Sequence, residues 1–422
     1  MKRVGHIFDA VVDRDNLREA FLKASRGKRH RMDQREYAQD LDCEIEKLRE
    51  GLLNVDYSVG NYTRFKIYDP KEREICVAPF RERVLHHALM NVCEPLFDKW
   101  LIYDTYACRK GKGQVRALER ACYYAGKYEW FLKCDFRKYF DSIPHEGLKR
   151  MIERKFKDPF VVAWFERIIN GYEKTPGRGL PIGNLTSQHL ANLYLDRLDR
   201  MCAGAYVRYM DDFVLWSHTK EELKEKRVAI IAFAREVLGL ELKGMPFINR
   251  TKLGMDFLGM RVLPRSLRLA RTSRKRFVRK ANAYGYAFEC GEMGEGEYQT
   301  RMTALTAFIE IASSRGFRQE YFRTHPISGN SNRVIRGGAY NNDASNCAFT
   351  YRNNNNPNND NNNNGFRLYC RSAWNEEMFD PGQCPVSSNG TKEGDRPDVS
   401  SMEQTLQEGV AHDEVSHIFG WV

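Results

Sequence analysis

Two adjacent acidic residues, Asp211 and Asp212, lie between short apolar runs in Ala205-Tyr-Val-Arg-Tyr-Met-Asp-Asp-Phe-Val-Leu-Trp216. The β-branched and aromatic residues on both sides predict a hairpin that carries the two carboxylates at its tip. Neighbouring carboxylates repel each other unless a cation neutralises them. The pair therefore indicates either a solvated turn or part of a metal site, and other carboxylates and phosphate-binding groups must decide between the two.

A third acid, Asp135, ends the apolar run Trp130-Phe-Leu-Lys-Cys-Asp135. This run predicts a strand, and Phe140 follows five residues later on the turn into a helix. An acid at the end of a strand is also a common cap for the next helix. Asp135 is therefore a candidate metal ligand that needs support from the rest of the chain.

A basic hairpin is predicted upstream, because residues 62–68 and 73–77 alternate as two strands around an Asp-Pro turn. Lys66, Lys71 and Arg73 cluster on this hairpin. Cations in such a place could close over a triphosphate, whereas ordinary solvated charges are the alternative.

Two glycine-bearing loops lead into predicted helices. Residues 106–113 form a basic loop that includes Arg109 and suits a nucleic-acid backbone, although its glycine pattern is not a P-loop. Residues 177–188 form a second loop, whose small residues allow a nucleotide or a template base to approach the backbone closely. Each loop alone could be an ordinary junction between a loop and a helix.

The remaining pattern predicts mostly helices. Residues 12–54, 79–95, 188–201, 221–238 and 297–313 read as helical, and a helix with a dense cationic face begins at Arg271. Residues 252–262 predict a second hairpin. A basic helical region of this kind can follow the phosphates of a nucleic-acid duplex, and a solvated charged face is the alternative.

The charge distribution supports a polyanionic partner. The chain has 422 residues and a formal net charge of +11; residues 1–325 contain 60 Lys and Arg against 44 Asp and Glu, whereas residues 326–422 contain 7 against 12. The basic part therefore carries +16 and the tail −5, so nucleic acid is the expected partner, with a solvated basic surface as the alternative.

The cysteines and the hydropathy of the sequence indicate the cellular compartment in which we expect the protein. The eleven cysteines include no CxxC pair and no His/Cys cluster at zinc spacing, which predicts reduced thiols in a cytoplasm. No apolar run approaches ~18 residues and the start lacks an apolar signal core, so neither a membrane partner nor export is expected.

The order of these features resembles motifs A, B and C of the reverse transcriptases over approximately residues 15–325. Asp135 matches motif A, the loop and helix at 183–188 match motif B, and Asp211-Asp212 matches motif C. The resemblance implies an α+β fold, a right-hand polymerase with fingers, a palm made of a ferredoxin-like antiparallel sheet with helices, and a helical thumb. It implies the following division: 1–60 N-terminal helical extension, 61–130 fingers, 131–262 palm with inserted fingers elements at 145–180, and 263–325 thumb.

The resemblance also implies roles for individual residues in RNA-directed DNA synthesis with two Mg²⁺ ions, or Mn²⁺ as a substitute. Asp135 and Asp211 would bridge the two ions, with Asp212 and the Phe136 carbonyl beside them. The other implied roles are nucleotide binding by Lys71, Arg73, Gly183 and Gln188, exclusion of a ribose 2′-hydroxyl by Phe140, template contact by Arg109, Ile182 and Ser187, and a primer grip at Leu258 and Gly259.

The form of motif B refines the resemblance. Ile182-Gly-Asn-Leu-Thr-Ser-Gln188 is similar to the reverse transcriptases of diversity-generating retroelements, which copy a template-repeat RNA into cDNA with errors at adenine and send the product into a variable gene. The implied partners are the template RNA, the cDNA/RNA hybrid, dNTPs and a small basic accessory protein. A group II intron maturase-like splicing factor is the alternative within the same fold.

The tail is of a different kind. Residues 353–364 are almost entirely asparagine, and the flanking 333–340 and 365–368 resemble the end of a formylglycine-generating-enzyme-like C-type lectin. We interpret 326–372 as a translated template repeat, with simple low complexity as the alternative, and expect the acidic segment 373–422 to be poorly ordered. A ligand-binding display protein is the third functional hypothesis.

Overall fold

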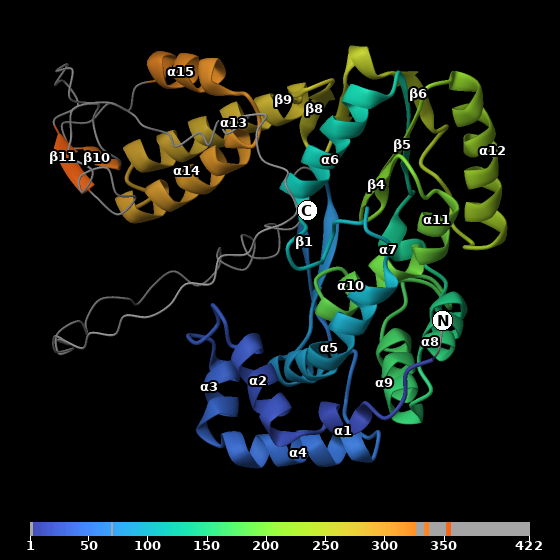
Figure 1. Cartoon of the computed structure of the whole chain (residues 1–422). Coiled ribbons are helices and arrows are strands. Elements are labelled where there is room, and N and C mark those ends of the chain that lie inside the picture. The colour runs from blue at the N-terminus through green and yellow to red at the C-terminus, as the bar shows by residue number, and fades with distance from the viewer. Residues whose placement is uncertain (1–2, 69–70, 326–332, 337–351, 356–422) are drawn as a thin grey trace, which may run out of the picture.

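The computed structural model describes residues 3–68, 71–325, 333–336 and 352–355, and the fold is α+β (Figure 1). Four helices lead into a hairpin and two longer helices: α1 (Phe8–Val11), α2 (Arg14–Ala24), α3 (Met32–Gln39), α4 (Leu41–Leu53), β1 (Thr63–Ile67), β2 (Arg73–Val77), α5 (Phe80–Trp100) and α6 (Gln114–Lys127). No helix in these ranges is long and apolar enough to cross a membrane.

A central sheet and its connecting helices follow. They are β3 (Trp130–Asp135), α7 (Tyr139–Ser142), α8 (His145–Lys155), α9 (Pro159–Asn170), α10 (Leu185–Tyr194), α11 (Asp196–Met201), β4 (Tyr206–Tyr209), β5 (Asp212–Ser217), α12 (Lys220–Glu236) and β6 (Phe247–Arg250). The last elements are the 3₁₀ turn Thr251–Leu253, β7 (Met255–Phe257), β8 (Met260–Leu263), β9 (Ser266–Leu269), α13 (Arg271–Glu289), α14 (Glu295–Glu310), α15 (Arg315–Thr324), β10 (Arg333–Arg336) and β11 (Arg352–Asn355).

The central sheet has the strand order β4-β5-β3-β6, and all its pairs are antiparallel. In chain order this is a β-α-β-β-α-β arrangement, the ferredoxin-like topology, in which helices join consecutive strands that are not neighbours in the sheet. The antiparallel sheet expected from the sequence is therefore present. Strand β6 was not predicted, because its short segment lacks a strong alternation.

Each face of this sheet is covered by a different helix. Leu132 and Phe213 belong to the core that includes Leu223 and Ile230 of α12, whereas the alternate residues Phe131 and Val214 pack in the core of α6. Side chains alternate between the two faces of a strand, so one sheet serves two cores. Figure 1 shows α6 and α12 on opposite sides of the strands.

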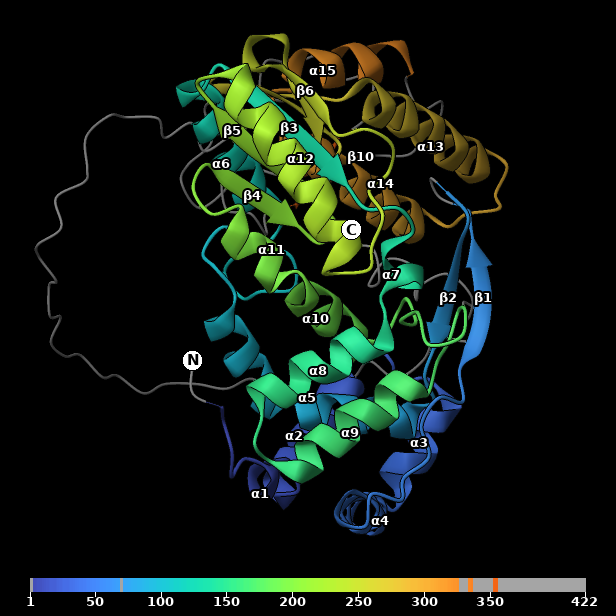
Figure 2. The same cartoon turned by 90° about the vertical axis from the view of Figure 1, so that its right-hand side faces the viewer.

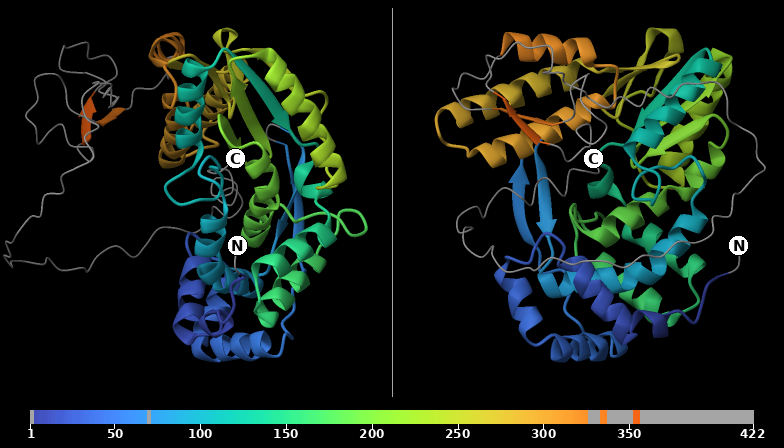
Figure 3. Two further views of the ribbon diagram at one scale, coloured as in Figure 1. Left: turned by 45° about the vertical axis from the view of Figure 1, so that its right-hand side comes forward. Right: turned by 60° about the vertical axis from the view of Figure 1, so that its left-hand side comes forward.

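The hairpin and the C-terminal helices flank the sheet. Strands β1 and β2 are antiparallel and lie at one side of the structure, between the N-terminal helices and α13–α14 (Figures 2 and 3). The second predicted hairpin is a three-stranded sheet, β7-β8-β9. Strand β9 and helix α15 were missed from the sequence. The single helical region expected at 12–54 is three separate helices, because a turn with Gly27 at φ 69° separates α2 from α3 and the non-helical Asp40 separates α3 from α4.

One buried ion pair anchors the hairpin formed by β4 and β5. The Arg208 guanidinium is fully buried and donates to both carboxylate oxygens of Asp199 at 2.6 Å, to Asn192 and to the Met210 carbonyl at 2.9 Å. Tyr206 also donates to Asp199 at 2.7 Å. Because Met210 is in the turn itself, this network joins α11 to the tip of the hairpin.

We expect Arg208→Met to lower the free energy of unfolding by about 3–5 kcal/mol, since it leaves the Asp199 carboxylate buried without its cation. Urea unfolding followed by circular dichroism measures this change. The control is Lys226→Met, which removes an exposed pair with Glu222 and should cost less than about 1 kcal/mol. Equal losses in the two variants would show that the buried pair does not stabilise the fold.

Candidate active site

The predicted acids come together at the ends of two paired strands. Asp135 is the last residue of β3 and lies opposite Asp212, the first residue of β5. Met210 and Asp211 form the two-residue turn between β4 and β5, with Met210 in the left-handed region at φ 56°. The hairpin expected from the sequence is confirmed, and it places Asp211 beside the two strand residues.

Two lysines lie on these carboxylates. Lys243 donates to Asp135 Oδ2 at 2.8 Å, and Lys133 lies 3.1 Å from Asp212 Oδ2. Lys133 also donates to the Asp256 carbonyl at 2.7 Å, which ties β3 to β7. Both cations offset the repulsion among the acids.

Burial and mutual repulsion set the protonation of the acids. Burial, followed by the charge of Asp135, raises the pKa of Asp211 to about 7. Burial also raises the pKa of Asp212 to about 6, although Lys133 acts in the opposite direction. The Asp212 Oδ1 atom is buried and has no hydrogen-bond partner among the described residues. The acids are therefore in an environment that a further cation would relieve.

The donor types fit a hard divalent cation, because Mg²⁺ is bound by carboxylate and carbonyl oxygens. Within the described ranges, no group of three or more His, Cys, Asp or Glu side chains is arranged to hold a metal ion directly. The lysines on Asp135 and Asp212 occupy oxygens that such an ion would use. Asp135, Asp211 and Asp212 are the residues that would hold it.

The predicted nucleotide-binding cations lie near the acids. The pKa of Lys71 is lowered, mainly by the positive charge of Lys243, and the charge of Arg73 lowers the pKa of Asp211 against the larger effects that raise it. Lys66, in contrast, pairs with Glu72 at 2.7 Å. The start of β2 and the turn before it therefore bring Arg73 and Lys71 near the acids, whereas Lys66 of β1 is in an exposed surface pair.

Strand β2 is joined to the loop before α10. The Cys76 amide donates to the Ile182 carbonyl at 2.8 Å. Gly183 has φ 117°, and a Cβ atom there would meet the Cys76 carbonyl at 2.8 Å. Only glycine fits this contact without a backbone shift. Ile182 and Gly183 are thus held against the strand that carries Arg73.

The other predicted residues of this region are arranged around the same loop. Phe140 is half-buried on α7, and its carbonyl accepts the Leu180 amide at 2.8 Å. Ser187 is buried, and Gln188 Oε1 accepts from the Cys108 thiol at 3.5 Å. Phe140 therefore lies next to Leu180, near the start of the loop at 177–188, whereas Gln188 lies at the end of this loop.

Phe136 and Arg109 are both engaged within the protein. The Phe136 ring is buried and packs on Tyr139 and Phe213, and its carbonyl role stays a prediction. Arg109 is taken up by Asp98 at 2.5 Å and by the carbonyls of Ile102 and Thr105. Its guanidinium orders the loop after α5, and its template contact stays a prediction.

The residues of the expected primer grip form a tight turn. Leu258 and Gly259 have φ 48° and 78° between β7 and β8. The Leu258 carbonyl accepts from Gln114 of α6 at 2.7 Å, and a Cβ atom on Gly259 would lie 2.9 Å from the Phe308 ring of α14. The turn is therefore packed between α6 and the C-terminal helices.

Lys133 and Lys243 were missed from the sequence. Lys133 stands two residues before Asp135, and the alternation of a strand could have placed it on the same face. Lys243 gave no signal, because it reaches Asp135 only through the pairing of residues 241–243 with residues 135–137.

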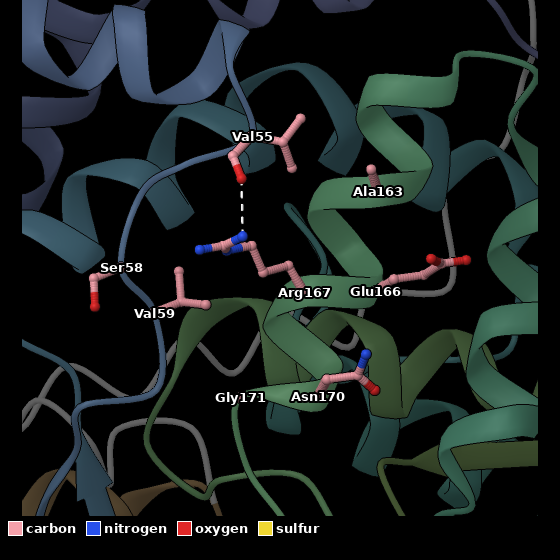
Figure 4. A pocket seen from close by; sticks show the side chains of 8 residues that line it. All are labelled: Val55, Ser58, Val59, Ala163, Glu166, Arg167, Asn170 and Gly171. Carbon is pink, nitrogen blue, oxygen red and sulfur yellow. Dashed lines mark hydrogen bonds between the residues drawn. The ribbon is translucent and has the colours of Figure 1, made fainter.

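Two hollows lie outside this corner. One, of about 540 Å³, lies behind α7 between residues 137–142, 174–178 and 239–241. The other, of about 440 Å³, lies between residues 55–59 and α9. Figure 4 shows Arg167 in the second hollow, where it donates to the Val55 carbonyl at 2.8 Å. Since this bond spans the hollow, Arg167 serves to join α9 to the chain before β1.

The part of the chain that carries the site is similar to a known protein family. Residues 68–262 match the family model "Reverse transcriptase (RNA-dependent DNA polymerase)". The matched range contains β2, β3, the β4–β5 hairpin and the β7–β8 turn. Residues 68–262 are therefore similar to the reverse transcriptase domain that this family shares.

Relatives of this domain are encoded by introns. The "Putative COX1/OXI3 intron 2 protein" of Saccharomyces cerevisiae is 26% identical over 30% of this chain and 16% of its own length. The "Group II intron-encoded protein LtrA" of Lactococcus lactis subsp. cremoris is 26% identical over 31% and 23%. The chain therefore spans less than a quarter of the length of these two relatives. The apo telomerase of Candida tropicalis has a TM-score of 0.42 at 10% identity, over 64% of this chain and 61% of that chain.

The raised pKa values predict a pH dependence of stability. In chelator-treated protein, the folded state binds more protons than the unfolded chain between about pH 4 and 7, because folding raises the pKa of Asp211 and Asp212. These two acids should therefore make stability fall as the pH rises through this range.

Asp211→Asn should reduce that fall by about 1 kcal/mol or more, as measured by urea unfolding at several pH values. Asp256→Asn is the control, because Asp256 is an exposed acid paired with Arg261. A wild-type slope in Asp211→Asn would contradict the raised pKa of Asp211.

Proposed function

We propose that this chain synthesises DNA on an RNA template, and that residue 135, the turn at 211 and the start of β5 are its catalytic corner. The main support is that Asp135 and Asp212 lie opposite each other in paired strands, with Asp211 in the adjoining turn. All three acids lie inside the range that matches the reverse transcriptase model. In this proposal the central sheet is the palm, β1–β2 belongs to the fingers and α13–α15 form the thumb. Reverse transcriptases as a family use divalent metal ions.

Asp135 and Asp211 would hold two Mg²⁺ ions, with Asp212 and the Phe136 carbonyl supporting them. When bound, the ions supply charge stabilisation for the attacking 3′-oxygen, the α-phosphate and the leaving pyrophosphate. Lys243 contacts Asp135 within the same corner and would exchange this contact for a phosphate oxygen as the nucleotide enters.

Lys71 and Arg73 would bind the triphosphate, since both lie near the acids and carry positive charge. The ring of Phe140 would fill the volume of a ribose 2′-hydroxyl and so favour deoxynucleotides. Leu258 and Gly259 would hold the primer strand, because their turn lies between α6 and the C-terminal helices. Ile182, Ser187 and Gln188 would lie under the templating pair.

The finer part of the proposal is that the enzyme belongs to a diversity-generating retroelement. The sequence Ile182-Gly-Asn-Leu-Thr-Ser-Gln188 supports it. The enzyme would then work in the cytoplasm, copy a template repeat with errors at adenine, and require a small basic accessory protein to place the structured RNA. The residues of the supposed template repeat lie almost entirely outside the described ranges.

A group II intron maturase-like role is the second candidate, and the intron-encoded relatives support it. The two candidates share the catalytic domain and differ in the RNA that they recognise. A display function of the C-terminal segment remains a hypothesis on residues that lie mostly outside the described ranges.

Replacing a bridging acid tests the catalytic proposal. We expect Asp135→Asn and Asp211→Asn each to lower Mg²⁺-dependent extension of a DNA primer on an RNA template by about a thousandfold or more, because the charge that holds the ions is lost. Single-turnover extension measures the loss. Asp256→Asn should extend like the wild type, and undiminished extension by either of the first two variants would exclude these acids from catalysis.

A fidelity measurement tests the retroelement proposal. Ile182 stands where the superfamily usually has a polar glutamine, and it contacts β2, so it would shape the pocket under the template base. We expect Ile182→Gln and Arg73→Ala to lower misincorporation opposite template adenine several-fold, with smaller changes opposite other bases. Sequencing cDNA made on one template measures both rates. Unchanged adenine errors in both variants would place fidelity in other residues.

A further inference from the structure

Five side chains along α6 and the loop before it alternate between cations and aromatic rings. Lys112 lies 3.3 Å from the ring centroid of Tyr103, and Arg120 lies 5.8 Å from Tyr103 and 5.2 Å from Tyr123. Lys127 follows at 4.4 Å from the Tyr123 ring. We call this row Lys112, Tyr103, Arg120, Tyr123 and Lys127 the α6 ladder.

The ladder is fixed from below by a buried acid. Asp104 is 9% exposed and accepts two hydrogen bonds from Arg120, at 2.9 and 3.2 Å. The hydroxyls of Tyr106 and Tyr124 donate to the same carboxylate at 2.9 and 3.1 Å. The Arg120 guanidinium is therefore held in one place, with its flat face available to the neighbouring rings.

The rings of the ladder face solvent instead of completing a core. Tyr103 is 69% exposed and Tyr123 is 47% exposed. Preordered aromatic rings between cations suit the stacking of unpaired bases, while the cations attract the phosphates that join them. A solvated ladder of internal cation–ring contacts would need no ligand, but the exposure of both rings and the row of cations beside them favour a ligand.

The ladder begins next to the turn that we assign to the primer. Gln114, the first residue of α6, donates to the Leu258 carbonyl at 2.7 Å. From there α6 extends to Lys127, a length of about 20 Å at the rise of an α-helix. The ladder therefore runs along α6 from the turn at Leu258 and Gly259.

We propose that the α6 ladder binds a single-stranded segment of the template RNA, with bases stacked on Tyr103 and Tyr123. This inference rests on the proposed function for the identity of the strand. Newly made DNA is paired with its template, so the unpaired strand near a working polymerase is RNA that has not been copied. Nucleic acid also matches the cations of the ladder, whereas a basic accessory protein would be repelled by them.

The test compares two double variants of the full chain. Tyr103→Ala/Tyr123→Ala removes both rings, and Tyr103→Phe/Tyr123→Phe keeps them. Binding to an unstructured single-stranded RNA is measured by fluorescence anisotropy at fixed salt. We expect the first variant to bind about tenfold or more weakly, and the second to bind like the wild type, because stacking uses the ring and not the hydroxyl. Phe160→Leu, which changes a 41% exposed ring on α9, should bind like the wild type.

The outcomes separate this inference from the proposed function. Extension of a DNA primer on an RNA template whose unpaired overhang is too short to reach the ladder should be unchanged in both double variants. Failure of this extension in the wild type would overturn the proposed function without affecting the binding comparison. Equal RNA binding by the Ala and Phe variants would overturn the ladder proposal. The proposal would also be overturned if the Ala variant lost as much affinity for double-stranded RNA as for single-stranded RNA, or if the wild type bound single-stranded DNA as tightly as RNA. A third contrary outcome is that the Ala variant loses affinity only for a purified protein partner.

Discussion

The catalytic corner depends on holding like charges close together. Asp135, Asp211 and Asp212 meet at the ends of β3 and β5, in an environment that raises the pKa of the last two. Two unit charges about 4 Å apart interact by about 4 kcal/mol when the effective dielectric constant is near 20. Lys133 and Lys243 offset part of this repulsion. The rest of the fold must offset the repulsion that remains between the carboxylates.

The ferredoxin-like sheet supplies that stabilisation from behind the acids. Arg208 joins the turn at Met210 to Asp199 of α11, so a fully buried ion pair holds this turn against α11. The two faces of the sheet are filled by separate cores, against α12 and α6. A rigid scaffold of this kind suits a site whose ligands repel each other, because loss of order would separate the acids.

Local patterns predicted the acids, and long-range contacts explain what was missed. Alternation and turn residues were enough for the β4–β5 hairpin and for the strand that ends at Asp135. Lys243 contacts Asp135 although more than a hundred residues separate them in the sequence. The local hydrophobic periodicity of the sequence cannot predict such a long-range contact. The partners of Arg109 were also not predicted: its guanidinium donates to Asp98 and to backbone carbonyls, which the composition of its basic loop did not indicate.

The same long-range pairing couples the nucleotide side of the site to the template side. Strand β2 carries Arg73, and three residues later its Cys76 amide is bonded to Ile182. Gly183 allows this approach because any side chain there would collide with the Cys76 carbonyl. A change in the shape of residue 182 would thus be felt by the strand that carries Arg73. If Arg73 binds the incoming nucleotide as we propose, discrimination would depend on the two segments together.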